Sequence, residues 1–102
     1  MTDLTALQAA ILKSLGHPTR VKLVELLRGG ERCVCELIAE LGLEQSNVSQ
    51  HLGILKHAGL VASRKDGLRV MYRLTDPRVI ELLDLARDLI AARVKKTLAA
   101  LE

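Results

Sequence analysis

The sequence predicts a single, mostly α-helical domain that contains one small β-hairpin. Three observations support this fold class. Apolar residues recur every three to four positions in five segments, which is the spacing of amphipathic helices. Two short strand-like runs flank the dipeptide Asp66-Gly67, which is typical of a hairpin. The length of 102 residues fits one domain spanning residues 1–102, with four helices, two strands and a fifth helix in chain order.

Glycine residues mark the ends of the first three predicted helices. Leucine, valine and isoleucine repeat at helical spacing before each of these glycines. The second helix begins at Pro18, because proline is tolerated in a first helical turn. The ends are Gly16 after Leu4–Leu15, the pair Gly29-Gly30 after the segment that starts at Pro18, and Gly42 after Val34–Leu41.

A fourth helix follows a short turn, and the third and fourth helices together have the arrangement of a helix-turn-helix. Ser46 is a good N-cap for the fourth helix, and Gly59 ends it. Val48, Leu52 and Leu55 share its inward face. A turn of about four residues that contains glycine separates the two helices. The spacing therefore predicts a helix-turn-helix with the fourth helix as its recognition helix.

The next segment is predicted to form a basic hairpin directly after the recognition helix. Leu60–Lys65 and Leu68–Leu74 are the two strands, and Asp66-Gly67 is the turn. One face of the second strand is expected to pack and the other to stay available. The alternating residues are Val70, Tyr72 and Leu74 on the packed face and Arg69, Met71 and Arg73 on the other. A hairpin in this position is a wing, so the sequence predicts a winged helix-turn-helix.

The last predicted helix carries a wider apolar stripe than one small domain can cover. Asp76 caps this helix, and Pro77 occupies its first position. Part of the stripe is expected to meet a second protomer, which predicts a homodimer joined through the first and last helices. The stripe consists of Val79, Ile80, Leu82, Leu83, Leu85, Ala86, Leu89, Ile90, Val94, Leu98 and Leu101.

The positive charge is concentrated in the segment that holds the fourth helix and the hairpin. The chain has a formal net charge of +3, and residues 46–75 contain five basic side chains and one acidic side chain. A local basic surface of this kind is expected to bind a polyanion. Tyr72 is the only aromatic residue, which excludes the stacking platforms that bind single-stranded nucleic acid. Together with the predicted winged helix-turn-helix, this charge distribution favours double-stranded DNA as the partner.

Two groups of residues are predicted to contact DNA. Amides and hydroxyls on the outer face of the fourth helix suit base edges and phosphates, and Ile54 can touch a thymine methyl group. Basic side chains at the hairpin tip, with Arg64 and Arg73 beside them, suit phosphates or the minor groove. The predicted contacts are Ser46, Asn47, Ser49, Gln50 and His51 in the helix, and Lys65 and Arg69 in the hairpin.

Four stretches of the chain resemble the ArsR/SmtB family of winged-helix repressors. They begin at Leu15, Glu31, Gln45 and Lys65, and they read LGHPTR, ERCVCEL, QSNVSQHL and KDGLRVMYRL. The resemblance extends over nearly the whole chain, from about residue 4 to residue 101. It implies a small dimeric protein that releases operator DNA when a metal or metalloid binds.

Cys33 and Cys35 form the predicted inducer site. They lie at the start of the third helix, where exposed amides, the helix dipole and Arg32 favour thiolates, the form that binds soft metals. The Cys-Val-Cys match resembles the arsenic, cadmium and lead sensing branches of the family. This implies As(III) or Sb(III) as inducer, with cadmium and lead as further candidates. Side chains two apart on a regular helix point about 200° from each other, yet one ion must contact both sulfurs. Binding is therefore expected to unwind the first turn of the third helix. Because this helix supports the recognition helix, the recognition helix is expected to move as well.

The sequence leaves the third ligand of such a site open. Family members with a three-cysteine arsenic site place the third thiol where Ile38 stands here, and no cysteine precedes Cys33. A cellular thiol, hydroxide or His17 can supply the ligand, although His17 fits a helix boundary better. The zinc site of other members needs histidine in the last helix, which contains none.

Two other interpretations of the cysteine pair stay open. Free thiols in a reducing cytoplasm are expected, because neither a signal peptide nor an apolar run of membrane-spanning length is visible. Thiolates at a helix start oxidise readily, so the pair can serve the same repressor as a redox or reactive-sulfur switch. A small thiol-dependent enzyme is disfavoured, because the chain has neither a glycine-rich anion loop nor a Cys-x-x-Cys motif.

Overall fold

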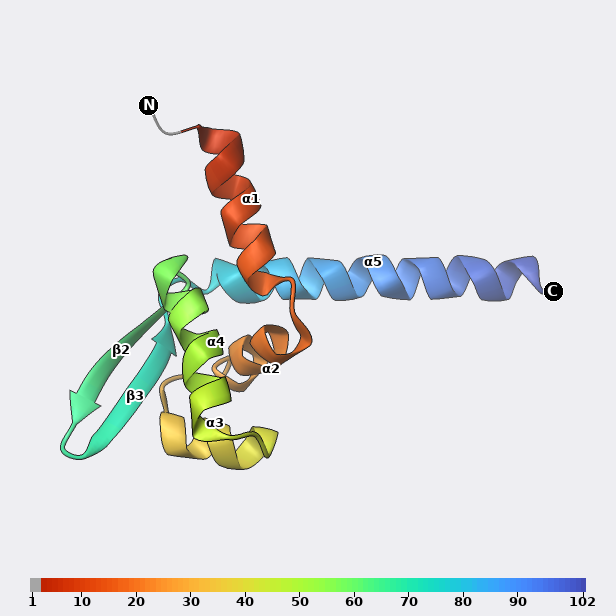
Figure 1. Ribbon diagram of the computed structural model, residues 1–102. Helices are drawn as coiled ribbons and strands as arrows, with labels where there is room; N and C mark the ends of the chain where they lie inside the picture. The colour runs from red at the N-terminus through yellow and green to blue at the C-terminus, as the bar shows by residue number, and fades with distance from the viewer. Residues whose placement is uncertain (1–2) are drawn as a thin grey trace.

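In the computed structural model, which describes residues 3–102, short helices pack against a small antiparallel sheet (Figure 1). The sheet has three strands in the order β1-β3-β2. The predicted fold class is confirmed: a mostly helical domain in which a hairpin follows the fourth helix. The elements are α1 (Leu4–Leu15), α2 (Pro18–Leu26), β1 (Arg32–Cys33), α3 (Val34–Leu41), α4 (Gln45–His57), β2 (Val61–Asp66), β3 (Arg69–Leu74) and α5 (Arg78–Ala100).

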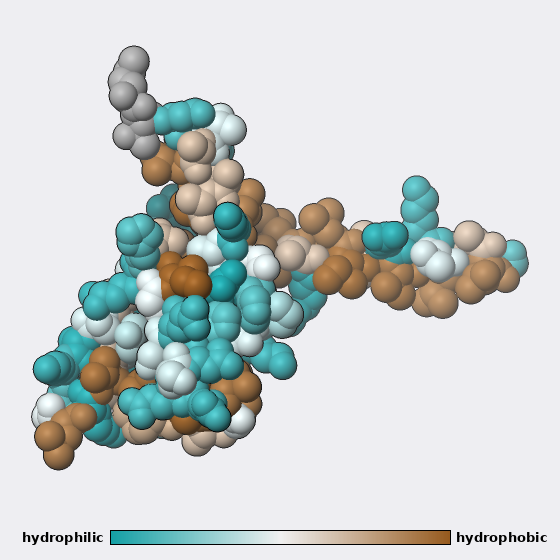
Figure 2. Space-filling model, in the orientation of Figure 1, coloured by the Kyte–Doolittle hydropathy of each residue, from teal (hydrophilic) through white to brown (hydrophobic). Residues whose placement is uncertain are grey.

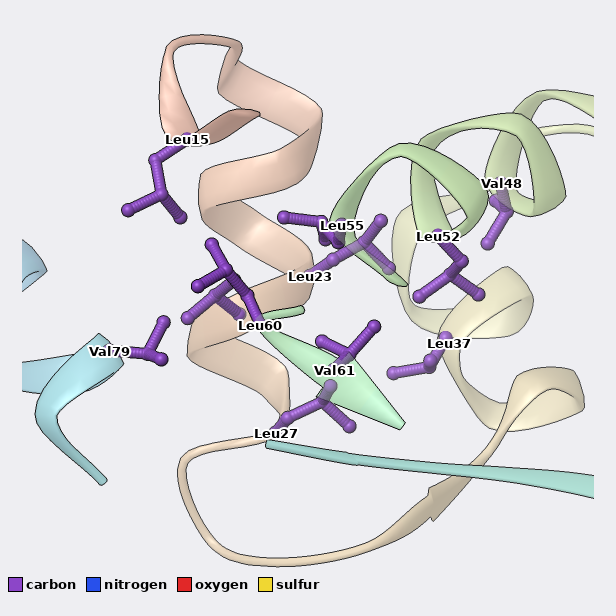
Figure 3. Close-up of a cluster of buried hydrophobic side chains, with 11 residues drawn as sticks. Leu15, Leu23, Leu27, Leu37, Val48, Leu52, Leu55, Leu60, Val61 and Val79 are labelled. Carbon is purple, nitrogen blue, oxygen red and sulfur yellow. The ribbon is translucent and has the colours of Figure 1, made fainter. Parts of the chain in front are cut away.

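Leucine and valine side chains from helices and strands meet in one hydrophobic core (Figure 3). Burying one such side chain stabilises the fold by about 1.5–3 kcal/mol relative to leaving it exposed. Because α2, α3 and α4 share this core, the outer face of α4 has a fixed orientation relative to the rest of the domain. The core residues are Leu15, Leu23, Val24, Leu27, Leu37, Val48, Leu52, Leu55, Leu60, Val61 and Val79.

Glycines end α1 and α3 at the predicted positions. α1 stops before Gly16, and α3 stops before Gly42, which has a φ of 65°. Glycine favours this left-handed conformation because it has no Cβ atom. The helical part of α2 ends at Leu26, and a turn then leads to the Gly29-Gly30 pair.

Two of the predicted helix starts are wrong by one or two residues. α4 begins at Gln45 after an extended Glu44, so Ser46 lies inside the first turn and does not cap the helix. α5 begins at Arg78, one residue later than predicted. Asp76 nevertheless satisfies the start of α5, because its Oδ1 accepts a hydrogen bond from the backbone N–H of Arg78 at 2.9 Å. The small shifts leave the faces of both helices unchanged.

The predicted wing is present, with its turn shifted by one residue. Asp66 pairs with Arg69, so the two turn residues are Gly67 and Leu68. Gly67 has a φ of 63°, and glycine at the first of two turn positions suits a type II′ turn. Leu68 is fully exposed at the tip of the wing.

A third strand, which the sequence pattern did not predict, pairs with the wing. β1 contains only two residues, too few to show an alternation. Arg32 pairs with Tyr72 and Cys33 pairs with Met71 in β3. Met71 is buried, which corrects the prediction that its face of the strand stays open. Side chains directly opposite each other in antiparallel strands share a face, so Cys33 and Met71 lie on the same side of the sheet.

The apolar stripe of α5 is largely uncovered in the protomer. α5 extends far beyond the body of the domain in Figure 1, and brown apolar surface follows it in Figure 2. Leu89, Ile90 and Leu98 are 73%, 64% and 59% exposed, whereas Val79 at the base of the helix is buried. Among the described residues, no helix has the length and apolar character needed to cross a membrane. An exposed apolar stripe of this kind marks a candidate interaction surface, and the second protomer expected on it stays a prediction.

Candidate DNA interface and cysteine site

α4 has one buried face and one exposed polar face. Val48, Leu52 and Leu55 have a relative exposure of zero. Successive residues of a helix are about 100° apart, so Gln50 lies opposite these three side chains. Four of the five residues predicted to contact DNA from this helix are exposed together: Ser46, Asn47, Ser49 and Gln50. Ile54 is also exposed on this side.

His51 differs from the other predicted contacts, because its ring is half-buried against α2. Its Nδ1 lies 3.2 Å from Nη1 of Arg20. The ring centroid lies 4.5 Å from that of His17. Burial lowers the pKa of His51, and the nearby His17 and Arg20 lower it further. His51 therefore sits at the edge of the exposed face of α4, held by contacts within the protomer.

The two predicted wing contacts have different surroundings. Lys65 and Arg69 are both exposed. Arg69 forms an ion pair across the turn, with Nη2 3.7 Å from Oδ2 of Asp66. Lys65 has no ion-pair partner among residues 3–102, so its charge is the more available of the two for a phosphate.

Arg64, beside the wing tip, is tied to the loop before β1. Its Nε donates to Oε2 of Glu31 at 2.9 Å, and Nη2 donates to the other carboxylate oxygen. This hydrogen bond lowers the pKa of Glu31. The pair anchors β2 to the segment that carries Cys33, so Arg64 is less available for DNA than the charge count alone suggested.

Cys33 and Cys35 meet at the N-terminus of α3. Cys33 is the N-cap, with φ −67° and ψ 141°, and its sulfur accepts a hydrogen bond from the backbone N–H of Cys35 at 3.1 Å. Glu36 completes the capping box, because its Oε1 accepts from the backbone N–H of Cys33 at 3.3 Å. The two sulfur atoms are joined in a disulfide, and the Cα atoms are 5.2 Å apart.

This arrangement corrects two expectations about the cysteines. The side chains do not point to opposite edges of the helix, because Cys33 is extended and only Cys35 is helical. The sulfurs therefore meet without unwinding the first turn. The thiols are also paired in a disulfide where free thiols were expected. Cys33 is buried, whereas Cys35 is exposed, so the pair is accessible from one side.

A third ligand does not accompany the cysteine pair. Within residues 3–102, no group of three or more His, Cys, Asp or Glu residues is placed to hold a metal ion. His17 is the N-cap of α2, where its Nδ1 accepts from the backbone N–H of Thr19 at 3.1 Å. Its predicted place at a helix boundary is confirmed. The described residues therefore bring two sulfur atoms together, joined in a disulfide, without a third protein ligand beside them.

A helix-turn-helix followed by a basic wing defines a winged helix-turn-helix DNA-binding regulator. The family described as "Bacterial regulatory protein, arsR family" matches residues 17–63. An HTH-type transcriptional regulator of Mycobacterium tuberculosis is 43% identical over 97 residues, which cover 94% of this chain and 85% of the relative. A probable mercury resistance operon repressor of Streptomyces lividans is 41% identical over 83 residues, covering 81% of this chain and 66% of the relative. The chain belongs to the arsR family of bacterial regulators.

Solved structures agree with this assignment. The crystal structure of Rv0081 from M. tuberculosis superposes with a TM-score of 0.84 at 40% identity, covering 96% of this chain and 99% of that one. The homodimeric winged helix-turn-helix domain of Mb0332 from Mycobacterium bovis, solved by NMR, has a TM-score of 0.82 at 28% identity, with 94% and 93% covered. The chain is thus a DNA-binding transcriptional repressor of this family, and the thiol-enzyme interpretation is wrong.

The sequence interpretation missed the partners that hold two of these residues. Arg20 contacts His51 across 31 positions of the chain, and Glu31 contacts Arg64 across 33. Neither contact leaves a periodic signal, because each joins residues on different elements. The LGHPTR stretch, which contains Arg20, was visible only as part of the family resemblance.

Proposed function

We propose that this chain is a cytoplasmic, homodimeric repressor that binds two-fold symmetric operator DNA and releases it when As(III) or Sb(III) binds Cys33 and Cys35. Cadmium and lead are further candidate inducers. The observation that carries the inducer site is the extended N-cap conformation of Cys33, which places both sulfurs on the same side of the helix start. The disulfide must first be reduced by two electrons from a cellular thiol or another reductant, which gives the two thiolates that soft metals and metalloids prefer as ligands.

The proposed DNA contacts divide into base reading and phosphate anchoring. Gln50 and Asn47 lie on the exposed face of α4, where amide groups can pair with the edge of adenine in a major groove. Lys65 and Arg69 lie at the wing, where they suit phosphate or the minor groove. Ser46 and Ser49 reach phosphates or bases at the start of α4. These positions support the docking of α4 into the major groove with the wing along the flanking backbone.

A second copy of the chain is the proposed partner of α1 and α5. Leu7 and Leu12 in α1 are 49% and 60% exposed, and the stripe of α5 is exposed over most of its length. Ile11 and Leu12 of α1 line a shallow groove together with Gln8 and with Leu82 of α5, so apolar side chains of the two helices adjoin there. Burial of such surface in a dimer is favourable at about 25 cal/mol per Å². The homodimeric relative from M. bovis supports this assembly.

The proposed signal passes from the cysteines to the wing through β1. Cys33 ends β1 and pairs with Met71 in β3, and the neighbouring Glu31 holds Arg64 in β2. A ligand that redirects the sulfur of Cys33 acts on the strand that pairs with the wing. Release by distortion of the wing therefore replaces the expected unwinding of α3. The coupling between inducer and DNA is expected to be about 1–3 kcal/mol, which is typical of allosteric proteins.

A redox or reactive-sulfur switch at the same cysteines is the second candidate function. The disulfide between Cys33 and Cys35 favours it, as does the exposure of Cys35 to oxidants. In this alternative the dithiol form binds DNA and the oxidised form releases it. The DNA interface and the dimer are the same in both proposals, so one experiment can distinguish the two inducers.

Fluorescence anisotropy tests the inducer on a duplex that the wild-type protein selects from random-sequence DNA. Under anaerobic conditions with a non-thiol reductant, arsenite is expected to release this duplex from the wild-type protein. Cys33→Ser and Cys35→Ser should bind it with similar affinity and fail to release it, because the chain has two cysteines and each variant keeps one. Full release from a serine variant, or none from the wild type, contradicts the metalloid proposal. Release by an oxidant alone supports the thiol switch.

A further inference from the structure

The side chain of Arg20 connects three helices beside the exposed face of α4. Its Nε donates to the backbone oxygen of Ser14, in the last turn of α1, at 2.6 Å. Its Nη1 lies 3.2 Å from Nδ1 of His51 in α4. Ser14 is buried, and its hydroxyl donates to the backbone oxygen of Ile11 at 2.6 Å. The carbonyl that holds Arg20 therefore belongs to a well-anchored turn.

The contact with Arg20 determines which nitrogen of His51 carries the proton. A guanidinium group only donates hydrogen bonds, so Nδ1 of His51 must accept. The imidazole is then neutral, with its proton on Nε2. Burial, the His17 ring and Arg20 lower the pKa of His51, which agrees with a neutral ring at pH 7.

His17 restricts the His51 ring from a second direction. The two ring planes are tilted by 38° with their centroids 4.5 Å apart. His17 is itself held by the backbone N–H of Thr19. In residues 3–102, no side-chain nitrogen or oxygen is both buried and without a hydrogen-bond partner. Nε2 of His51 has no partner among these residues, so it reaches solvent as an oriented donor.

His51 lies on the flank of α4 that faces α2. It is about 100° around the helix from Gln50, which lies opposite the buried face. When α4 lies in a major groove, a side chain on the flank of the helix is closer to the sugar-phosphate backbone than to the base pairs. Phosphate oxygens accept hydrogen bonds from neutral and charged side chains in this position.

We propose that Arg20 is a positioning residue of the DNA interface, which holds His51 so that its Nε2–H donates to a phosphate oxygen at the edge of the major groove. This inference rests on the proposed docking of α4 in that groove. Arg20 itself acts through His51, and its second contact, to Ser14, keeps the guanidinium group in place. The contribution of His51 is to affinity for the DNA backbone and not to the choice of sequence.

Histidine side-chain NMR of the free protein tests the role of Arg20. Long-range ¹H–¹⁵N spectra distinguish the two neutral tautomers, and loss of one signal in a His51→Gln variant assigns the ring. The wild-type ring is expected to be protonated at Nε2 only, and Arg20→Met is expected to give a mixture of tautomers and a higher pKa. A wild-type His51 that carries its proton on Nδ1, or a tautomer unchanged in Arg20→Met, overturns the proposal.

A pair of substitutions at His51 tests the donor without relying on Arg20. The amide nitrogen of glutamine can occupy the place of Nε2, whereas that of asparagine lies near Nδ1. His51→Asn is expected to bind both the selected duplex and a random-sequence duplex about tenfold more weakly than His51→Gln. A loss of about this size is expected when one hydrogen bond to a charged acceptor is removed. Equal affinities of the two variants, or a loss confined to the selected duplex, overturn the phosphate contact.

Gln50→Ala separates failure of this inference from failure of the proposed docking face. If Gln50→Ala weakens the selected duplex while the two His51 variants bind alike, α4 reads the DNA and only the role of His51 is refuted. If Gln50→Ala also leaves the affinity unchanged, the docking face is wrong and both proposals fall. Circular dichroism melts of all variants show that each retains the fold.

Discussion

α4 and α5 are both amphipathic helices, yet they expose opposite parts of their surfaces. In α4 the apolar residues Leu52 and Leu55 are completely buried and the polar face is open. In α5 the apolar stripe is largely open, and only the first half of the helix, up to Arg87, contacts the body of the domain. The sequence patterns are similar, and the difference lies in which elements of the same protomer surround each helix. In the proposed function α4 offers a polar face to DNA, whereas α5 offers an apolar face to a second protomer.

The largest expected effect comes from removing a core side chain of α4. Leu52→Ala should lower the free energy of unfolding by about 2–5 kcal/mol, because it leaves a cavity among fully buried neighbours. Urea denaturation followed by circular dichroism measures this loss. Leu68→Ala is the matched control, since the same substitution falls at the fully exposed tip of the wing, away from the proposed dimer face, and should cost less than half as much. A loss of equal size in both variants contradicts the assignment of the apolar face of α4 to the core.

A charge in the stripe of α5 should dissociate the proposed dimer. Ile90→Glu loses the burial of one isoleucine per protomer, about 1.5–3 kcal/mol each, and places a carboxylate in an apolar interface. Sedimentation equilibrium at micromolar protein should then detect monomers. Lys95→Glu is the control, because it lies about 140° around the helix from Ile90 and should leave the dimer intact. A wild-type monomer, or a dimer that tolerates Ile90→Glu, refutes the assigned interface.

Substitutions on the open face of α4 and on the wing should affect DNA binding in different ways. Gln50→Ala should relax base preference at one operator position by about 1–3 kcal/mol. Lys65→Ala and Arg69→Ala should weaken all duplexes alike and flatten the salt dependence of binding, and Lys65 should have the larger effect because Asp66 shares the charge of Arg69. Anisotropy titrations over a range of salt concentrations measure both quantities. Unchanged affinity in all three variants means that another surface docks on DNA.

The smallest expected effect concerns the start of α5. The side chain and backbone of Arg78 lower the pKa of Asp76 to about 2, below its ordinary value of 3.8. A carboxyl group whose pKa is lowered by folding stabilises the fold at a pH above its ordinary pKa. This contribution to the free energy of unfolding is lost as the pH falls toward 2. Asp76→Asn should therefore make the urea midpoint fall less steeply between pH 4 and pH 2. Equal slopes in Asp76→Asn and the wild type would falsify the assignment.

The cysteine site and the recognition helix were predictable to different degrees. The candidate residues of both were named from sequence, Cys33 and Cys35 by soft-ligand chemistry at a helix start and Gln50 by its place opposite an apolar stripe, and their roles stay predictions. The face of α4 followed directly, because helical periodicity depends on residues only three or four positions apart. The relation between the two sulfurs did not follow, because Cys33 belongs to a strand that the pattern did not reveal.

Sequence by itself determined the helices, the wing and the uncovered stripe of α5, since periodicity, glycine conformations and turn chemistry act between near neighbours. Tertiary structure alone decided three features of the site. Cys33 is extended where β1 pairs with β3, His51 turns toward Arg20, and Glu31 holds Arg64. Each feature joins residues far apart in the chain. Such contacts arise only after the core has brought their elements together, so local patterns carry no signal for them.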